Sequence, residues 1–454
     1  MGINSTFCGG EPVWANACVG NNGNPDYYDY AKGYSSAANL LIKTVLDGRG
    51  LTYSVDQFVY PICFNMRHSV ELRLKGACGS LKKLSEYRGA LEKFDLRGSH
   101  DIGGIWDYIK RMSAGIDERF LFFIDFLDKR ILDLAEIDAT GQTFRYPDDN
   151  DNVKHLVEVS LINIKNLSRR FSELEYILDC FEYFCDEIVR EYGYKTFTTK
   201  LSRPQLRQIR LRLPERATWG DDSFKALAVE IKNEYGLSNN DFSRALCKLK
   251  EHYAGGSKME PPPLVYIDEA GVFSFFDAWF ELNSIEVLCR GSKPEEIDLA
   301  DFASLEGVFG EIKERAKKEH DIWPKIEGVF SVEWLADLKA LYELSGSKYS
   351  EEYVRLVNME HRSLLCEVEG GESTFKYSLF KLLGRPGAVG RILKSLYFLG
   401  YGDFAEVLID KYGLSENFSW LEKARVDELF YEPYRASWIR CAEVLALDFE
   451  KKDD

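Results

Sequence analysis

The chain has 454 residues, 45% of them apolar and 14% aromatic, which is enough for two or three domains that each bury a core. Its formal net charge of −16 excludes a protein that coats nucleic acid or an anionic membrane over its whole surface. It contains no run of 18 apolar residues, and its ten cysteines include no Cys-x-x-Cys pair. We therefore expect a cytoplasmic protein with no membrane-spanning helix, with reduced and mostly buried thiols, and with no metal site or other cofactor.

The N-terminal part of the chain is predicted to be helical, because almost no stretch alternates apolar and polar residues with a period of two. Residues 1–25 are rich in Gly and Asn, which predicts a flexible segment. Residues 26–194 are predicted to form a helical bundle. The expected helices are 26–46, 56–75, a helix that starts at an N-cap on Ser99, 120–134, and a long amphipathic helix from about Val153 to Tyr192.

The helix expected at 56–75 is the element around which the bundle should be built. Its apolar residues occupy most of its circumference, which is typical of a helix in the middle of a bundle. Arg67, Glu71 and Lys75 nevertheless recur every four residues along one strip, with His68 beside them. Buried charges are rare unless they are paired or functional, so the strip is either an internal ion-pair ladder or the wall of a polar cleft.

A basic helical segment, residues 195–256, is expected after the bundle. Between Lys195 and Arg216 it has seven cations opposed only by Glu215, so it could bind phosphate or form a solvated helix face that answers acidic neighbours. The arginines predicted to contact nucleic acid are Arg203, Arg207, Arg210 and Arg212.

A linker at 257–263 leads to a C-terminal helical domain, residues 264–454, with at most a short strand near 264–268. Asp268 and Glu269 follow that strand in a way similar to an RNase H-like nuclease, which would need a further carboxylate nearby to hold metal. Residues 338–351 and 393–406 match without gaps and read as two copies of a helical hairpin. Stacked hairpins often form a surface for a protein partner.

Three motifs lie in order within residues 30–190. They are Glu71-Leu72-Arg73-Leu74-Lys75-Gly76-Ala77, His100-Asp101-Ile102, and Arg145-Tyr146-Pro147-Asp148. Their order and spacing resemble the HEPN superfamily of helical domains (higher eukaryote and prokaryote nucleotide-binding). The Arg67-His68 pair also resembles bacterial helical proteins of the phage-defence type. The resemblance implies an antiparallel helical bundle that often dimerises. Together with the C-terminal hairpins, this predicts an all-α fold in which a HEPN-like bundle precedes further helical hairpins.

The resemblance also implies a function: an RNA-binding or RNA-cleaving effector of the toxin or phage-defence type that needs no metal. In the ribonucleases of this family a histidine moves protons and an arginine stabilises the phosphorane. The catalytic candidates in the bundle are Arg67, His68, Glu71, His100 and Arg145.

The nuclease motif of the family, Arg-x4–6-His, occurs twice outside the bundle. Arg315 with His320, and Arg355 with His361, are therefore second-choice catalytic candidates, although the first pair lies in a charged run that is typical of a solvated helix face. The alternative function is a non-catalytic helical scaffold or nucleotide-binding module that acts through protein partners. In that case the charged strip fixes helix register and has no chemistry.

Overall fold

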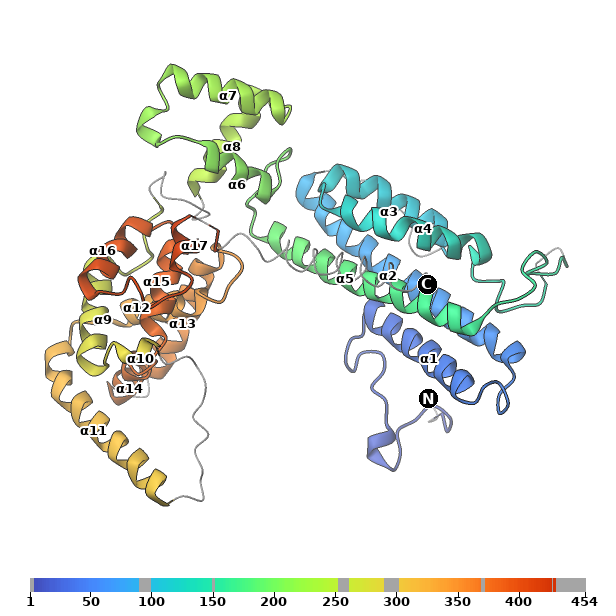
Figure 1. Ribbon diagram of the computed structural model, residues 1–454, viewed down its shortest axis with the longest axis horizontal. Helices are drawn as coiled ribbons and strands as arrows, with labels where there is room; N and C mark the ends of the chain where they lie inside the picture. The colour runs from blue at the N-terminus through green and yellow to red at the C-terminus, as the bar shows by residue number, and fades with distance from the viewer. Residues whose placement is uncertain are drawn as a thin grey trace. The chain divides into compact units, whose positions relative to one another are not determined.

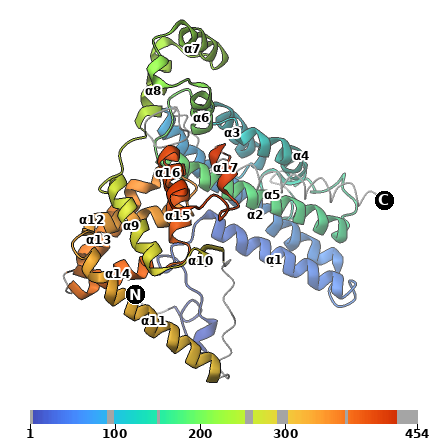
Figure 2. The same ribbon diagram turned by 60° about the vertical axis from the view of Figure 1, so that its left-hand side comes forward.

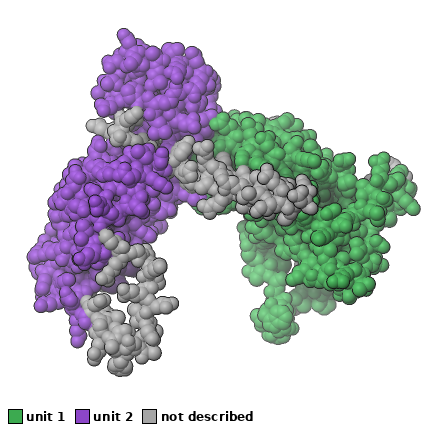
Figure 3. Space-filling model, viewed as in Figure 1, with its two compact units in different colours: residues 1–193, 437–454 green, residues 194–436 purple. Residues whose placement is uncertain are grey.

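The structure is a computed structural model in which all regular elements of the described residues are helices, seventeen of them α-helices. This confirms the predicted all-α class. The chain divides into two compact units: the described residues up to Gly193 belong to the first unit, and those from Tyr194 onward belong to the second (Figure 3). The described residues are 4–89, 99–148, 152–251, 261–289, 302–368, 372–426 and 428–429.

The first unit is built around α2, which packs against α1, α3 and α5 (Figure 1; Figure 2). Helix α4 packs against both α3 and α5. The elements of this unit are the 3-10 turn η1 (Val13–Ala15), α1 (Tyr27–Asp47), α2 (Val55–Arg88), α3 (Ile102–Ile116), α4 (Phe120–Asp138) and α5 (Ile164–Gly193).

Burial explains why α2 occupies the centre of the first unit. All residues from Ser69 to Lys75 are buried, so two consecutive turns of the helix are covered on every face. A Cβ added to Gly76 would lie 2.6 Å from the ring of Tyr28, so the absence of a side chain at this position lets α1 approach α2 closely. The helix runs past the predicted end at 75 and stops at Gly89, whose φ of 71° supplies a left-handed cap.

Two predicted helix starts in the first unit are wrong, because other residues cap the helices. Helix α3 is capped by Asp101, whose side chain accepts a hydrogen bond from the Gly103 amide at 3.0 Å, and Ser99 does not cap it. Helix α5 begins at Ile164 and not near Val153, since the Asn163 side chain accepts from the Asn166 amide at 3.0 Å.

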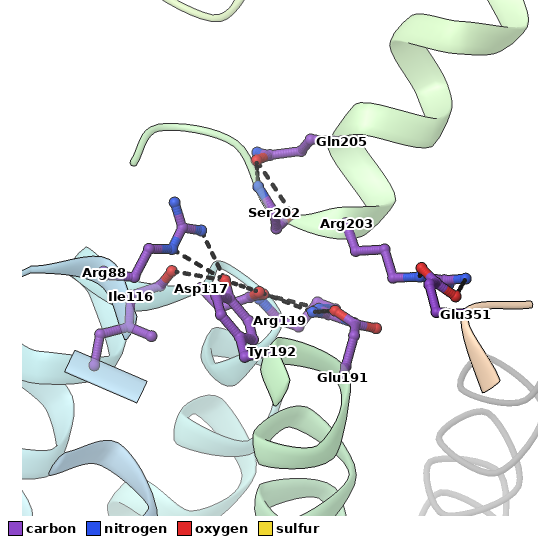
Figure 4. A network of polar contacts seen from close by, with 10 residues as sticks. All are labelled: Arg88, Ile116, Asp117, Arg119, Glu191, Tyr192, Ser202, Arg203, Gln205 and Glu351. Carbon is purple, nitrogen blue, oxygen red and sulfur yellow. Dashed lines mark hydrogen bonds and ion pairs between the residues drawn. The ribbon is translucent and has the colours of Figure 1, made fainter. Parts of the chain in front are cut away.

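A buried polar network ties the ends of four helices together in the first unit (Figure 4). Arg119 lies between the carboxylates of Asp117 and Glu191, at 2.8 and 2.6 Å. The Tyr192 hydroxyl donates to Asp117 at 3.0 Å and accepts from Arg88 at 2.7 Å. Burial opposes ionisation of Asp117, but the hydrogen bonds and charge of Arg119 hold its pKa below the ordinary value. The charged groups of this network therefore all have partners within the unit, and their role is structural.

The second unit contains a small three-helix cluster, α6–α8, and a larger helical domain with its own apolar core. Its elements are α6 (Arg203–Arg212), η2 (Arg216–Thr218), α7 (Asp222–Glu234), α8 (Asn239–Glu251), α9 (Glu269–Leu282), α10 (Glu286–Cys289), α11 (Phe302–Ile326), α12 (Val332–Leu344), α13 (Glu352–Val368), α14 (Glu372–Leu383), α15 (Ala388–Phe398), α16 (Gly402–Tyr412) and α17 (Leu421–Arg425).

The short strand considered near 264–268 does not form. The buried carboxylate of Asp337 instead accepts hydrogen bonds from the amides of Tyr266 and Ile267, at 2.8 and 3.0 Å, and from the Tyr353 hydroxyl. Because a side chain satisfies these amides, the segment needs no partner strand. Burial raises the pKa of Asp337 above its ordinary value.

The two matching segments of the C-terminal region both contain a helix end, a turn and the start of a second helix. Helix α12 ends at Leu344, and α15 ends at Phe398, one residue before the position that matches Leu344. The Ser395 hydroxyl donates to the Leu341 carbonyl at 2.6 Å. The second helices differ in register, since Tyr349 lies in the turn before α13 whereas the matching Phe404 lies within α16. Both aromatic rings are buried.

Eight cysteines have described side chains, and none of these eight forms a disulfide. The expectation that the thiols are mostly buried is wrong, because four of the eight are exposed: Cys8, Cys18, Cys247 and Cys366.

Candidate functional site

The charged strip on α2 lies inside the first unit. Arg67 is 2% exposed, Glu71 1% and Lys75 7%, so the strip does not line an open cleft. The Arg67 guanidinium pairs with the Glu71 carboxylate four residues on, and Lys75 Nζ donates to the same carboxylate at 2.7 Å. We refer to these three residues together with His68 and His100 as the Arg67 cluster.

Backbone carbonyls from two distant segments complete the coordination of Arg67. Its Nε donates to the carbonyl of Asp138 at 3.2 Å, and its Nη2 donates to the carbonyl of Ala139 at 2.7 Å and to that of His100. With the bond to Glu71, four of the five N–H donors of a guanidinium are used. Arg67 thus joins α2 to the start of α3 and to the end of α4.

The loop after α4 fits closely over this guanidinium. Gly141 has a φ of +78°, in the left-handed region that favours glycine, and a Cβ at this position would lie 3.0 Å from Arg67 Nη1. The Asp138 carboxylate accepts from the Thr143 amide at 3.2 Å and so closes the same loop. Sequence reasoning did not identify Asp138, Ala139 or Gly141 as part of the cluster. The glycine in a polar loop was the one signal available.

Glu71 is the acceptor that the Arg67 cluster shares. Besides Arg67 and Lys75, its carboxylate contacts Nδ1 of His100 at 3.0 Å and Nδ1 of His68 at 3.7 Å. Burial opposes ionisation, but the contact with His68, the hydrogen bond from Lys75 and the charge of Arg67 hold the pKa of Glu71 well below its ordinary value. The carboxylate is therefore ionised at neutral pH and fully paired.

The two imidazoles of the cluster differ in exposure. The His100 side chain is 64% exposed and that of His68 is 26% exposed. The His68 ring meets the edge of Tyr34 at 4.5 Å between centroids and stacks on Phe64 at 5.7 Å. The structure thus brings both predicted histidines to one carboxylate.

Arg145 reaches this region only through an aromatic ring. It is exposed, and its guanidinium lies 5.7 Å from the Phe64 centroid and 5.4 Å from that of Tyr146. It makes no ion pair with any described residue. It does not contact Glu71. Four of the five catalytic candidates therefore belong to the Arg67 cluster, and Arg145 lies outside it.

Two of the four arginines predicted to bind nucleic acid pair with carboxylates of the second unit. Arg203 donates to Glu351 at 2.8 and 3.0 Å (Figure 4), and Arg212 pairs with Glu230 and Glu234 at 2.7 and 2.5 Å. Arg210 is 4% exposed and Arg207 is half-buried on the same helix, α6. These contacts fit the alternative interpretation, a helix face whose cations pair with acidic neighbours.

The second-choice pairs are each engaged with carboxylates. On α11, Arg315 pairs with Glu319 at 3.0 Å, while His320 is 87% exposed. On α13, Arg355 is 61% exposed, and His361 lies 3.8 Å from a carboxylate oxygen of Glu333. Positions five or six apart on a helix point in directions more than about 100° apart, so neither pair converges on one point.

Asp268 has a structural role. Its side chain caps α9 by accepting from the Gly271 amide at 2.8 Å. No group of three His, Cys, Asp or Glu side chains within the described ranges is arranged to hold a metal ion.

A pocket of about 500 Å³ lies beside the Arg67 cluster in the first unit, and we call it the apolar pocket. Helix α2 contributes Cys63 and Met66, which directly precede the cluster on that helix. Helices α4 and α5 and the loop between them supply the other walls. These walls consist of Lys129, Arg130, Asp133, Leu134, Ile137, Phe144, Val159, Ile162, Leu167, Arg170, Phe171 and Leu174.

No protein-family model, no curated protein and no solved structure matches this chain. None of the helices formed by the described residues is both long and apolar enough to cross a membrane.

Proposed function

We propose that the first unit is a non-catalytic HEPN-like module that acts by binding, and that the Arg67 cluster holds its helices in register. The observation that supports this proposal best is the coordination of Arg67. Four of its donors are used by Glu71 and three carbonyls, and its side chain is 2% exposed. To contact an RNA phosphate, Arg67 would have to leave these partners and expose a buried Glu71.

A binding role is supported by the apolar pocket, which lies directly beside the cluster. Concave sites of roughly 300–1,000 Å³ lined by apolar side chains are the usual form of small-ligand sites. A fixed α2 would keep the Cys63 and Met66 wall of this pocket in place.

A homodimer through the HEPN-like bundle and a protein partner at α12–α13 and α15–α16 belong to the same proposal. Sedimentation equilibrium of the full chain would test the dimer.

The second candidate function is metal-independent RNA cleavage. It is supported by the two imidazoles on Glu71, because an ionised carboxylate that orients histidines is a common arrangement in general acid–base catalysis. Arg145 is the predicted arginine that remains exposed near this surface and would bind the phosphate in place of Arg67.

One experiment separates the two functions. The purified full chain is incubated with mixed RNA in the presence of EDTA, beside His68→Ala, His100→Ala and the control Asp107→Asn, whose side chain is 62% exposed and has no proposed catalytic role. We expect the wild type and all three variants to leave the RNA equally intact. Cleavage by the wild type that falls at least about a hundredfold in His68→Ala or His100→Ala, but not in Asp107→Asn, would refute the non-catalytic proposal.

A further inference from the structure

The floor of the apolar pocket is hydrocarbon and sulfur. Cys63, Met66, Phe144, Phe171 and Leu174 are each no more than 7% exposed and belong to α2, α5 and the loop before α5. Burial raises the pKa of the Cys63 thiol to about 12, so this side chain is a neutral, weakly polar group at neutral pH.

This floor does not suit a nucleobase. A purine or pyrimidine carries several donors and acceptors, and burial of each of these groups without a hydrogen-bond partner is unfavourable. The deeply buried lining side chains offer one thiol as a hydrogen-bonding group. The part of a ligand that enters the pocket is therefore hydrocarbon.

Charged side chains mark the mouth of the pocket. Lys129, Arg130 and Arg170 line it together with one acid, Asp133, and Lys129, Asp133 and Arg170 are exposed. Lys129 makes no ion pair with a described residue, whereas Arg170 pairs with Glu173 at 3.3 Å. Burial and the positive charge of Arg170 contribute to a pKa of Arg130 below its ordinary value. The lining is thus richer in cations than in acids, which favours an anion at the mouth.

We propose that the apolar pocket binds a small amphipathic carboxylate, with its hydrocarbon chain against the Cys63–Met66 wall and its carboxylate among Lys129, Arg130 and Arg170. A pocket of about 500 Å³ has room for one chain of medium length. This inference rests on the proposed function in one respect, since it treats the first unit as a binding module, and it names the class of ligand.

The test is a calorimetric titration of the full chain with dodecanoate below its micelle concentration. Dodecyltrimethylammonium has a tail of nearly the same length with a cationic head and is the matched ligand control. We expect dodecanoate to saturate one site per chain and the cation to bind at least about tenfold more weakly. Equal binding of the two, or no saturable binding of dodecanoate, would overturn the proposal. Binding to phosphatidylglycerol vesicles without binding to free dodecanoate would also overturn it, because it would indicate a membrane surface.

Variants locate the site. Lys129→Glu combined with Arg170→Glu places two reversed charges at the exposed mouth and should weaken dodecanoate binding on the order of tenfold or more. Lys43→Glu, on the exposed face of α1, is the control and should leave binding unchanged. Val159→Trp should fill the pocket from its loop wall and abolish binding. An equal effect of Lys43→Glu and of the mouth variant would refute this location. This titration does not measure RNA cleavage. The proposed ligand can therefore be refuted while the non-catalytic proposal stands, and RNA cleavage can be found while the proposed ligand is confirmed.

Discussion

Replacing Glu71 by Gln is the most direct test of the Arg67 cluster as a structural element. The amide keeps the shape of the side chain but removes its charge. Arg67 and Lys75, both buried, then lose their common counter-ion, and His100 loses a charged acceptor. Only one oxygen remains to accept the hydrogen bonds that two carboxylate oxygens accept now.

The expected loss of stability is large because two cations are affected. Removing one partner of a buried ion pair typically costs roughly 3–5 kcal/mol, since the remaining charge is left uncompensated. The retained amide oxygen still accepts one hydrogen bond, so we expect about 3 kcal/mol for Glu71→Gln in the first unit. Asp107→Asn, in the exposed pair with Lys110 at 3.2 Å, is the matched control and should cost at most about 0.5 kcal/mol.

Hydrogen exchange measured by mass spectrometry on peptides of α2 reports the stability of the first unit without interference from the second unit. The same assay tests the pH dependence. The pKa of Glu71 is lowered in the folded state, so its stabilisation is present above the ordinary carboxyl value of about 4.5 and is lost as the pH falls below it. The wild type should lose protection in α2 from about pH 5 downward, and Glu71→Gln should lack this component. A loss below about 1 kcal/mol for Glu71→Gln, comparable with Asp107→Asn, would refute a structural role for the cluster.

The remaining predictions concern the loop over Arg67 and the ion pair of the second unit. Gly141→Ala should destabilise the first unit by roughly 1–3 kcal/mol, because it adds a Cβ at 3.0 Å from Arg67 Nη1 at a φ of +78°; a change below about 0.5 kcal/mol in exchange of α2 peptides would contradict this. The pKa of Glu351 is about 2 although burial opposes ionisation, because the Arg203 guanidinium supplies its main counter-charge. Arg203→Gln should therefore raise this pKa. The wild-type second unit should therefore lose on the order of 3 kcal/mol of stability as the pH falls from about 4.5 to 2, whereas Arg203→Gln should be less stable at pH 7 and show a smaller loss on acidification; exchange of α6 peptides that is equal in both proteins would contradict this.

Local sequence determined the helices and the geometry of neighbours within one helix. The apolar period predicted α1, and the near-complete apolar circumference of 56–75 predicted that α2 is central. The spacing of Arg67, Glu71 and Lys75 placed them on one strip, as they are found, because residues four apart share a helix face. The starts of α3 and α5 were predicted less accurately. Asp101 and Asn163 cap these helices, and a residue can act as a cap only where the chain before it turns.

Tertiary structure alone decided what the strip does. The acceptors of Arg67 include carbonyls of His100 and Ala139, which lie 33 and 72 residues away, and no local pattern identifies which carbonyls point inward. The same packing placed Arg145 on Phe64 and not on Glu71, and it enclosed a pocket whose walls come from three helices and a loop. Side-chain contacts within one helix follow from the period of that helix, but contacts between segments depend on how the helices pack. That packing decides whether a charged strip becomes a buried ion pair with all its partners or a site that a ligand can reach.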